Sequence, residues 1–141
     1  MRHGVKRGTL RVEAIQTMVE AAAERARALD IQVHIAVMDS AADLVGWLSF
    51  DGTPRIAATT ARHKAFTAVQ TGMPTVEWKA YVEGIPAEER QIIDGIDGYI
   101  AAAGGVPVIE DGILLGAIGV SGATQETDEA CARAAIEALG L

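Results

Sequence analysis

The stretch from Gly104 to Gly122 constrains the fold more than any other part of this 141-residue chain. Two apolar runs flank Glu110-Asp111-Gly112, and Asp-Gly between apolar runs is a strong signal for a tight β-hairpin. The second run carries glycine at positions 116, 119 and 122, where an ordinary strand would carry side chains. Because glycine weakens a strand, this repetition indicates close approach by another backbone, a helix or a ligand.

Apolar periodicity predicts the remaining elements. Residues 9–29 carry an apolar stripe at steps of three and four, which is typical of an amphipathic helix, and Thr9 is its expected N-cap. The further predicted elements, in chain order, are strands at 33–38 and 44–49 and helices at 54–71, 75–82, 87–93 and 125–139. Thr124 precedes the last helix and is its expected cap.

This order of elements is not the strand–helix alternation that makes a parallel sheet. It predicts a single α+β domain over residues 1–141, in which helices pack on an antiparallel sheet and residues 1–8 are flexible. A chain of this length suits one hydrophobic core. Four strands make a small sheet, so we expect a fifth strand near Ile100 or across a subunit boundary.

Composition narrows the class of partner. The formal net charge of −7 argues against nucleic acid or an anionic membrane, because both reward basic surfaces. No apolar run reaches the roughly 18 residues that a membrane span needs. Cys131 is the single cysteine, so we expect no internal disulfide and a reducing, cytoplasmic setting. The three histidines lack metal-binding spacing, so we expect no metal site.

The densest polar cluster inside an apolar helical segment is Arg62-His63-Lys64. Helical geometry places Arg62 and Lys64 beside the apolar stripe and directs His63 away from it. On one interpretation the two cations hold a ligand carboxylate. On the other they form a solvated face whose aliphatic stems cover apolar surface.

His34 lies inside the first predicted strand, between Val33 and Ile35. A histidine there is either a metal or haem ligand, a general base, or a core histidine with a satisfied hydrogen bond. Aromatic residues are few, and four of them either line an apolar pocket or subunit interface or pack in the ordinary way: Trp47, Phe50, Trp78 and Tyr99.

Four ordered motifs resemble the GlcG/HbpS-like haem-binding family, whose fold also forms the C-terminal domain of PduO-type proteins. They are residues 35–39, residues 61–68, Gly104-Gly105-Val106-Pro107, and residues 116–124 followed by Asp128-Glu129. The resemblance covers nearly the whole chain. It implies a profilin-like antiparallel sheet flanked by helices, and a homo-oligomer. Two features depart from the pattern: His34 stands where small residues are more usual, and residues 78–99 do not match.

The resemblance also implies a function. We expect a cytoplasmic small-molecule-binding protein, accessory to a catabolic or haem-linked pathway, with haem as the first candidate ligand. Its pocket would lie between the central helix and the second hairpin, near a subunit boundary. Arg62 and Lys64 would hold ligand carboxylates beside Gly105, and His63 or His34 would be the axial ligand.

Two alternatives stay open at this point. One is a small lyase- or isomerase-type enzyme acting on an aromatic or hydroxy-acid intermediate, with His34 or His63 as general base and Arg62 or Lys64 orienting a substrate carboxylate. The other is an accessory subunit without a ligand.

Overall fold

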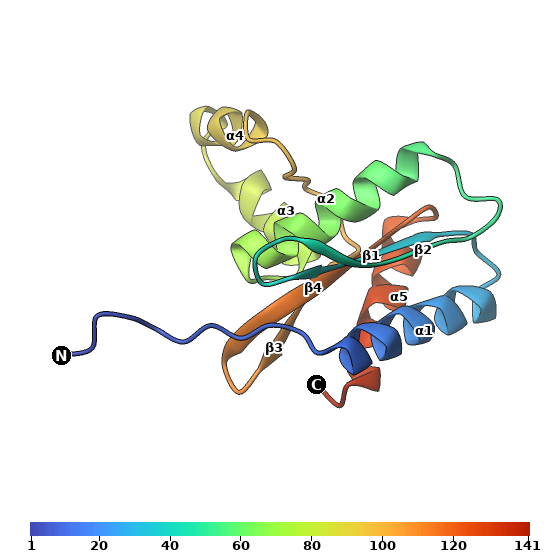
Figure 1. Ribbon diagram of the computed structural model, residues 1–141. Helices are drawn as coiled ribbons and strands as arrows, with labels where there is room; N and C mark the ends of the chain where they lie inside the picture. Colours follow the sequence, from blue (N-terminus) through green and yellow to red (C-terminus); the bar gives the residue numbers. More distant parts are fainter.

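The computed structural model describes residues 1–141 and contains one four-stranded sheet with five helices (Figure 1). The strands are β1 (His34–Asp39), β2 (Leu44–Ser49), β3 (Gly105–Glu110) and β4 (Ile113–Ser121). The helices are α1 (Val12–Ala28), α2 (Ile56–Thr71), α3 (Thr75–Gly84), α4 (Ala87–Asp94) and α5 (Gln125–Ala138). The strand order is β2-β1-β4-β3, and every neighbouring pair is antiparallel. The predicted α+β class is confirmed.

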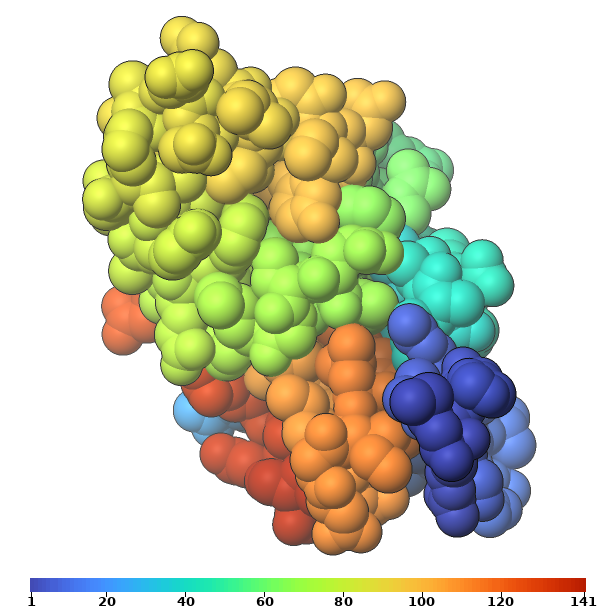
Figure 2. Space-filling view, turned by 90° about the vertical axis from the view of Figure 1, so that its left-hand side faces the viewer, coloured from blue at the N-terminus to red at the C-terminus, as the bar shows by residue number.

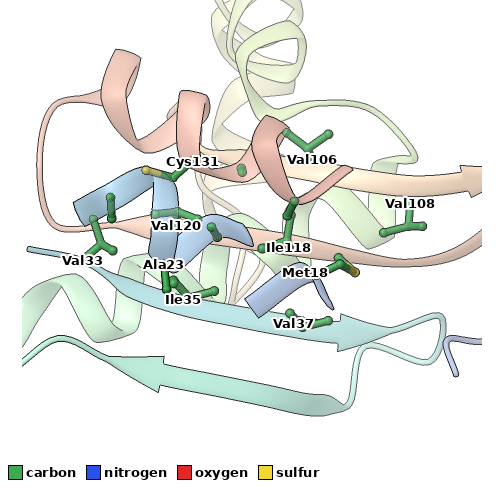
Figure 3. Close-up of a cluster of buried hydrophobic side chains, with 14 residues drawn as sticks. Met18, Ala23, Val33, Ile35, Val37, Val106, Val108, Ile118, Val120 and Cys131 are labelled. Carbon is green, nitrogen blue, oxygen red and sulfur yellow. The ribbon is translucent and has the colours of Figure 1, made fainter. Parts of the chain in front are cut away.

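The sheet is covered on both faces, with α1 and α5 on one side and α2 on the other (Figure 1). Alternation along residues 33–38 divides the side chains of β1 and of the residue before it between the two layers: Val33, Ile35 and Val37 enter the core under α1 and α5, and Ala36 and Met38 face α2. Figure 3 shows the first of these cores. Cys131 lies within it, and burial raises the pKa of its thiol to about 11.

The glycines of the second hairpin admit α2. A Cβ atom on Gly119 would collide with the backbone oxygen of Ala61, and one on Gly105 would collide with the backbone oxygen of Lys64. The helix presents alanines to the sheet, which lets the two backbones approach closely. The glycine pattern predicted close contact with another backbone, a helix or a ligand, and the structure shows that the contact is with helix α2. The space expected for a ligand between the central helix and this hairpin is therefore filled by the chain itself.

One predicted helix start is wrong, and of the two places expected for a fifth strand the one near Ile100 holds none. Helix α1 begins at Val12 rather than at residue 9, with Arg11 as its uncapped N-cap residue. Thr9 cannot cap it because the preceding segment is held on the sheet's hairpin end, where the Ser40 hydroxyl donates to the Gly8 carbonyl at 2.5 Å. No strand forms near Ile100, because its N–H donates to Thr67 Oγ1 (3.0 Å) rather than to a neighbouring strand.

Several local predictions hold. Gly72 ends α2 with a φ of 69°, in the left-handed region that suits glycine. Thr124 caps α5 by accepting from the Thr127 N–H at 3.2 Å. As for membranes, every helix here falls short of the length and apolar character that crossing a bilayer would require.

Helices α3 and α4 extend away from the sheet as an arm, which we define as residues 75–98 (Figure 1). Helix α3 is fixed by buried Thr75 and Val82, whereas α4 buries none of its residues. Thr75 joins the arm to the sheet, since its hydroxyl accepts from the Gly105 N–H at 2.8 Å.

Candidate functional site

A hydrogen-bonded chain fixes His34 beneath an exposed tryptophan. His34 is 1% exposed. Its Nε2 lies 3.1 Å from the Pro54 carbonyl oxygen, which only accepts, so Nε2 carries the proton. Nδ1 lies 2.7 Å from the Ser49 hydroxyl, and the same hydroxyl accepts from Trp47 Nε1 at 2.9 Å. The sequence and the strand register together set the orientation of the Trp47 ring.

The Trp47 indole is the exposed end of this chain of bonds. It stacks on His34, with ring centroids 5.5 Å apart and planes inclined by 24°. It is 38% exposed because β2 is the edge strand that α2 does not cover. The guanidinium of Arg62, an exposed residue of α2, lies 5.9 Å from the ring centroid. We call these four residues, His34, Trp47, Ser49 and Arg62, the Trp47 cluster.

A second polar cluster ties α2 to α5 past the end of the sheet. Lys64 Nζ donates to the Val120 carbonyl at 2.9 Å and to Asp128 Oδ2 at 3.1 Å, and both side chains are at least 96% buried. Asp128 Oδ1 accepts from the Ala123 N–H at 3.1 Å. Burial lowers the pKa of Lys64, and Asp128 opposes that shift by its charge and its hydrogen bond.

Gly104 and Gly105 pack directly against Lys64 and help to bury it. A Cβ atom on Gly104, whose φ is 127°, would lie 2.8 Å from Lys64 Nζ. Gly105 lies against the backbone of the same lysine. The Lys64 ammonium therefore already has an internal carboxylate and carbonyl as partners, and it faces no solvent.

The structure thus places the five predicted site residues in different parts of the fold: His34, Arg62, His63, Lys64 and Gly105. His34 and Arg62 meet in the Trp47 cluster, whereas Lys64 and Gly105 lie in the buried cluster with Asp128. His63 is half-buried on α2 and takes no part in the side-chain hydrogen bonds that hold His34. For a histidine that serves as base or ligand, a free ring nitrogen is needed, and in His34 both are engaged.

Two contributing residues were missed by sequence reasoning. Ser49 was taken as the end of a strand, and its pairing with His34 emerges only from the β1–β2 register. In the sequence, Asp128 stands out only as part of a family motif. A carboxylate in the first turn of α5, on the same side as its alanine stripe, was the available signal for a buried partner.

One open recess lies at the end of β2, with a volume of about 380 Å³. It is lined by Arg27, Gln32, Leu48, Ser49, Phe50 and Asp51. The Arg27 guanidinium lies 5.6 Å from the Phe50 ring centroid. Leu48 and Phe50 pack toward the α1–α5 core, so their side chains lie on the face of the sheet opposite to α2.

The fold and its site define a class of small α+β domain in which α2 is pressed against a glycine-bearing strand. The sequence model of the family described as "Haem degrading protein HbpS-like" matches residues 10–137, and the chain belongs to that family. This confirms the resemblance drawn from the motifs.

Individual relatives agree with that assignment. The corrinoid adenosyltransferase PduO of Salmonella typhimurium is 29% identical over 133 residues, which are 90% of this chain and only 38% of PduO. GlcG of Escherichia coli is 32% identical over 110 residues, covering 74% of this chain and 75% of GlcG. Among solved structures, the PduOC:heme complex has a TM-score of 0.84 and 27% identity, covering 92% of this chain and 94% of that one.

Proposed function

We propose that this protein binds haem at the surface formed by Trp47, Arg62 and His63. The observation that carries the proposal is the fixed, exposed Trp47 ring with the Arg62 guanidinium 5.9 Å over its centroid. A haem complex of a protein with the same fold supports the choice of ligand.

The residues of this surface fit the chemistry of a planar, carboxylate-bearing ring. An indole offers a flat apolar face for stacking, and its orientation is already fixed by Ser49 and His34. Arg62 supplies a guanidinium that pairs with a carboxylate in a bidentate manner. When bound, haem would supply redox-active iron.

His63 is the proposed axial ligand, because it has no competing hydrogen bond of the kind that engages His34. We assign Lys64 and Gly105 a different task. They hold α2 and α5 in register, so the ligand carboxylates contact Arg62 and not the buried ammonium.

A single chain covers only one side of such a ligand. The Trp47 cluster lies on the open face of an edge strand, where Leu44 and Val45 are also exposed, at 45% and 39%. A second subunit that covers this face would complete the site, and we propose a homo-oligomer for that reason. An accessory role in a catabolic or haem-linked pathway, and a cytoplasmic location, stay predictions.

The test is a titration of purified protein with haemin, followed by the Soret band. We expect saturable binding that weakens about tenfold, or about 1.4 kcal/mol, in Arg62→Gln. We expect His63→Ala to alter the band position, since the axial ligand sets the spectrum. Matched controls are Arg55→Gln at the exposed start of α2 and His3→Ala, which should bind as the original chain does.

Absence of a saturable Soret shift would reject haem as the ligand. Binding that both variants leave unchanged would reject this surface as the site. Both ring nitrogens of His34 are engaged, so the enzyme alternative would have to use His63 as its general base.

A further inference from the structure

The arm carries a concentrated negative charge beside apolar side chains that nothing covers. Residues 75–98 contain six acidic and two basic residues, so about a sixth of the chain holds more than half of the net charge of −7. Tyr81, Ile92 and Ile96 are 53%, 60% and 48% exposed. Helix α4 buries none of its own residues, so this surface has no partner within the chain.

The N-terminal residues carry positive charge, opposite to that of the arm. Residues 1–11 contain four basic residues, Arg2, Lys6, Arg7 and Arg11, and no acidic one. Residues 1–7, which we call the tail, are all exposed, and Val5 is 85% exposed. The tail thus alternates cations with an uncovered apolar side chain, which is the complement of the arm.

The tail and the arm of one chain do not meet. The tail projects from the hairpin end of the sheet, while the arm rises beyond α2 (Figure 1). Figure 2 shows them at separate places on the same face, with other parts of the chain between them. Gly8 holds the base of the tail through its bond to Ser40, and seven extended residues reach about 25 Å from that point.

We propose that the tail of one copy docks on the arm of a second copy, with Arg2, Lys6 and Arg7 facing the arm's carboxylates. The net charge of −7 makes two copies repel each other, and this contact offsets the repulsion where the charges are densest. Val5 covers part of the apolar surface around Ile92. The contact is independent of haem and of the Trp47 cluster.

Charge reversal followed by analytical ultracentrifugation tests the contact. The tail variant is Arg2→Glu/Lys6→Glu/Arg7→Glu, and the arm variant is Glu83→Lys/Asp94→Lys/Asp97→Lys. The arm positions are exposed and lie at helix ends or in the following loop, where lysine favours the helix dipole, so α3 and α4 should remain folded. Circular dichroism checks this.

At low salt we expect each single variant to dissociate at least about tenfold more readily than the original chain, and raised salt to weaken the original chain as well. A chain carrying both sets of reversals should associate again, because the charges are exchanged and not lost. The control Glu13→Lys/Glu20→Lys/Glu24→Lys reverses three exposed charges on α1 and should leave dissociation no more favourable than in the original chain.

Three results would overturn the proposal. The first is a monomeric mass at every concentration and salt level, which includes the case of a tail folded onto its own arm. The second is association that neither single variant weakens. The third is a double variant that stays as dissociated as the single ones.

Discussion

His34 shows how a histidine in a strand is stabilised when both ring nitrogens have fixed partners. Pro54 accepts from Nε2, and the Ser49 hydroxyl bonds Nδ1, so the ring is held in one orientation. This arrangement also affects Trp47, because the Ser49 hydroxyl accepts a hydrogen bond from the Trp47 indole N–H. A buried imidazole thereby orients an exposed indole.

Replacing His34 with alanine tests this role. We expect a loss of about 2–4 kcal/mol in the free energy of unfolding, from the cavity, from the Pro54 carbonyl left without its partner and from the Ser49 hydroxyl left with one bond fewer. In a Trp78→Phe background, Trp47 fluorescence should shift toward that of a solvated indole. His3→Ala, at an exposed position, should change neither quantity. Unchanged fluorescence in His34→Ala would show that the hydrogen bonds from His34 through Ser49 do not orient the Trp47 ring.

The buried Lys64–Asp128 pair permits a second substitution at this scale. Lys64→Met should destabilise the fold by about 3–5 kcal/mol, because Asp128 is left as an unpaired buried charge. The double variant Lys64→Met/Asp128→Leu should recover most of that loss. Lys79→Met, on the less buried arm, is the control for removing a lysine. Urea unfolding measures all four chains, and a single variant as stable as the control would refute the pairing.

The same lysine has a signature in pH. Burial lowers the pKa of Lys64 below its ordinary value of 10.5, so the folded chain releases this proton before the unfolded chain does. Between the lowered pKa and 10.5 the unfolded state binds more protons, and stability therefore rises with pH in that window. The stability difference between the original chain and Lys64→Met should grow across it. A difference that stays flat from neutral pH to 10.5 would contradict the lowered pKa.

The sequence identified the polar side chains of the candidate site but did not show which of them are exposed and which are buried. Arg62, His63 and Lys64 are adjacent, yet the first is exposed and the third is buried. Helical geometry predicted that His63 would point elsewhere than its neighbours. What it could not supply was Asp128, because a partner 64 residues away is set by how two helices pass the end of a sheet.

At the scale of elements, the closeness of α2 to the sheet depends on glycine. The structure leaves no space for a methyl group at Gly119, since the backbone of α2 occupies it. Gly119→Ala must therefore push the helix away or distort β4. We expect a loss of about 3 kcal/mol or more in the free energy of unfolding.

Gly84→Ala is the matched control, because nothing lies within 4 Å of a Cβ atom placed there and the residue belongs to helix α3. It should leave stability equal or raise it by up to about 1 kcal/mol. Thermal and urea unfolding of both variants decide the matter. Equal effects of the two substitutions would mean that α2 is not in tight contact with β4.

Element prediction succeeded where the signal was local. The hairpin turn, the end of α2 at Thr71 and the Thr124 cap depend on a few adjacent residues, and all were predicted. The start of α1 was misplaced because residues 8–10 are fixed by the distant Ser40 and by the core. The expected strand near Ile100 is absent for a similar reason, since Thr67 of α2 satisfies its N–H.

For the whole molecule, the sequence predicted the class of fold but not the position of the ligand surface. Glycine repetition correctly indicated close approach, and the helix of the chain itself proved to be the partner. Helix α2 lies over the inner strands and leaves the edge strand β2 open. That offset exposes Trp47, and no local pattern in the sequence encodes it.

The tail and the base of the tail should differ in their effect on the whole fold. Deleting residues 1–7 removes only exposed side chains, so we expect the free energy of unfolding to stay within about 0.5 kcal/mol. Deleting residues 1–10 also removes the Gly8 carbonyl that Ser40 binds and the partly buried Leu10 that packs on the main core. That loss should be about 2–3 kcal/mol.

Urea unfolding and ultracentrifugation of the two truncated chains, compared with the original chain, separate stability from association. The chain without residues 1–7 should unfold at the same urea concentration as the original chain but should dissociate more readily. Those two outcomes together would place the tail outside the fold and within the contact between copies. A shorter truncation that loses as much stability as the longer one would show that residues 1–7 pack on their own chain. The tail would then have no side chains free for a second copy.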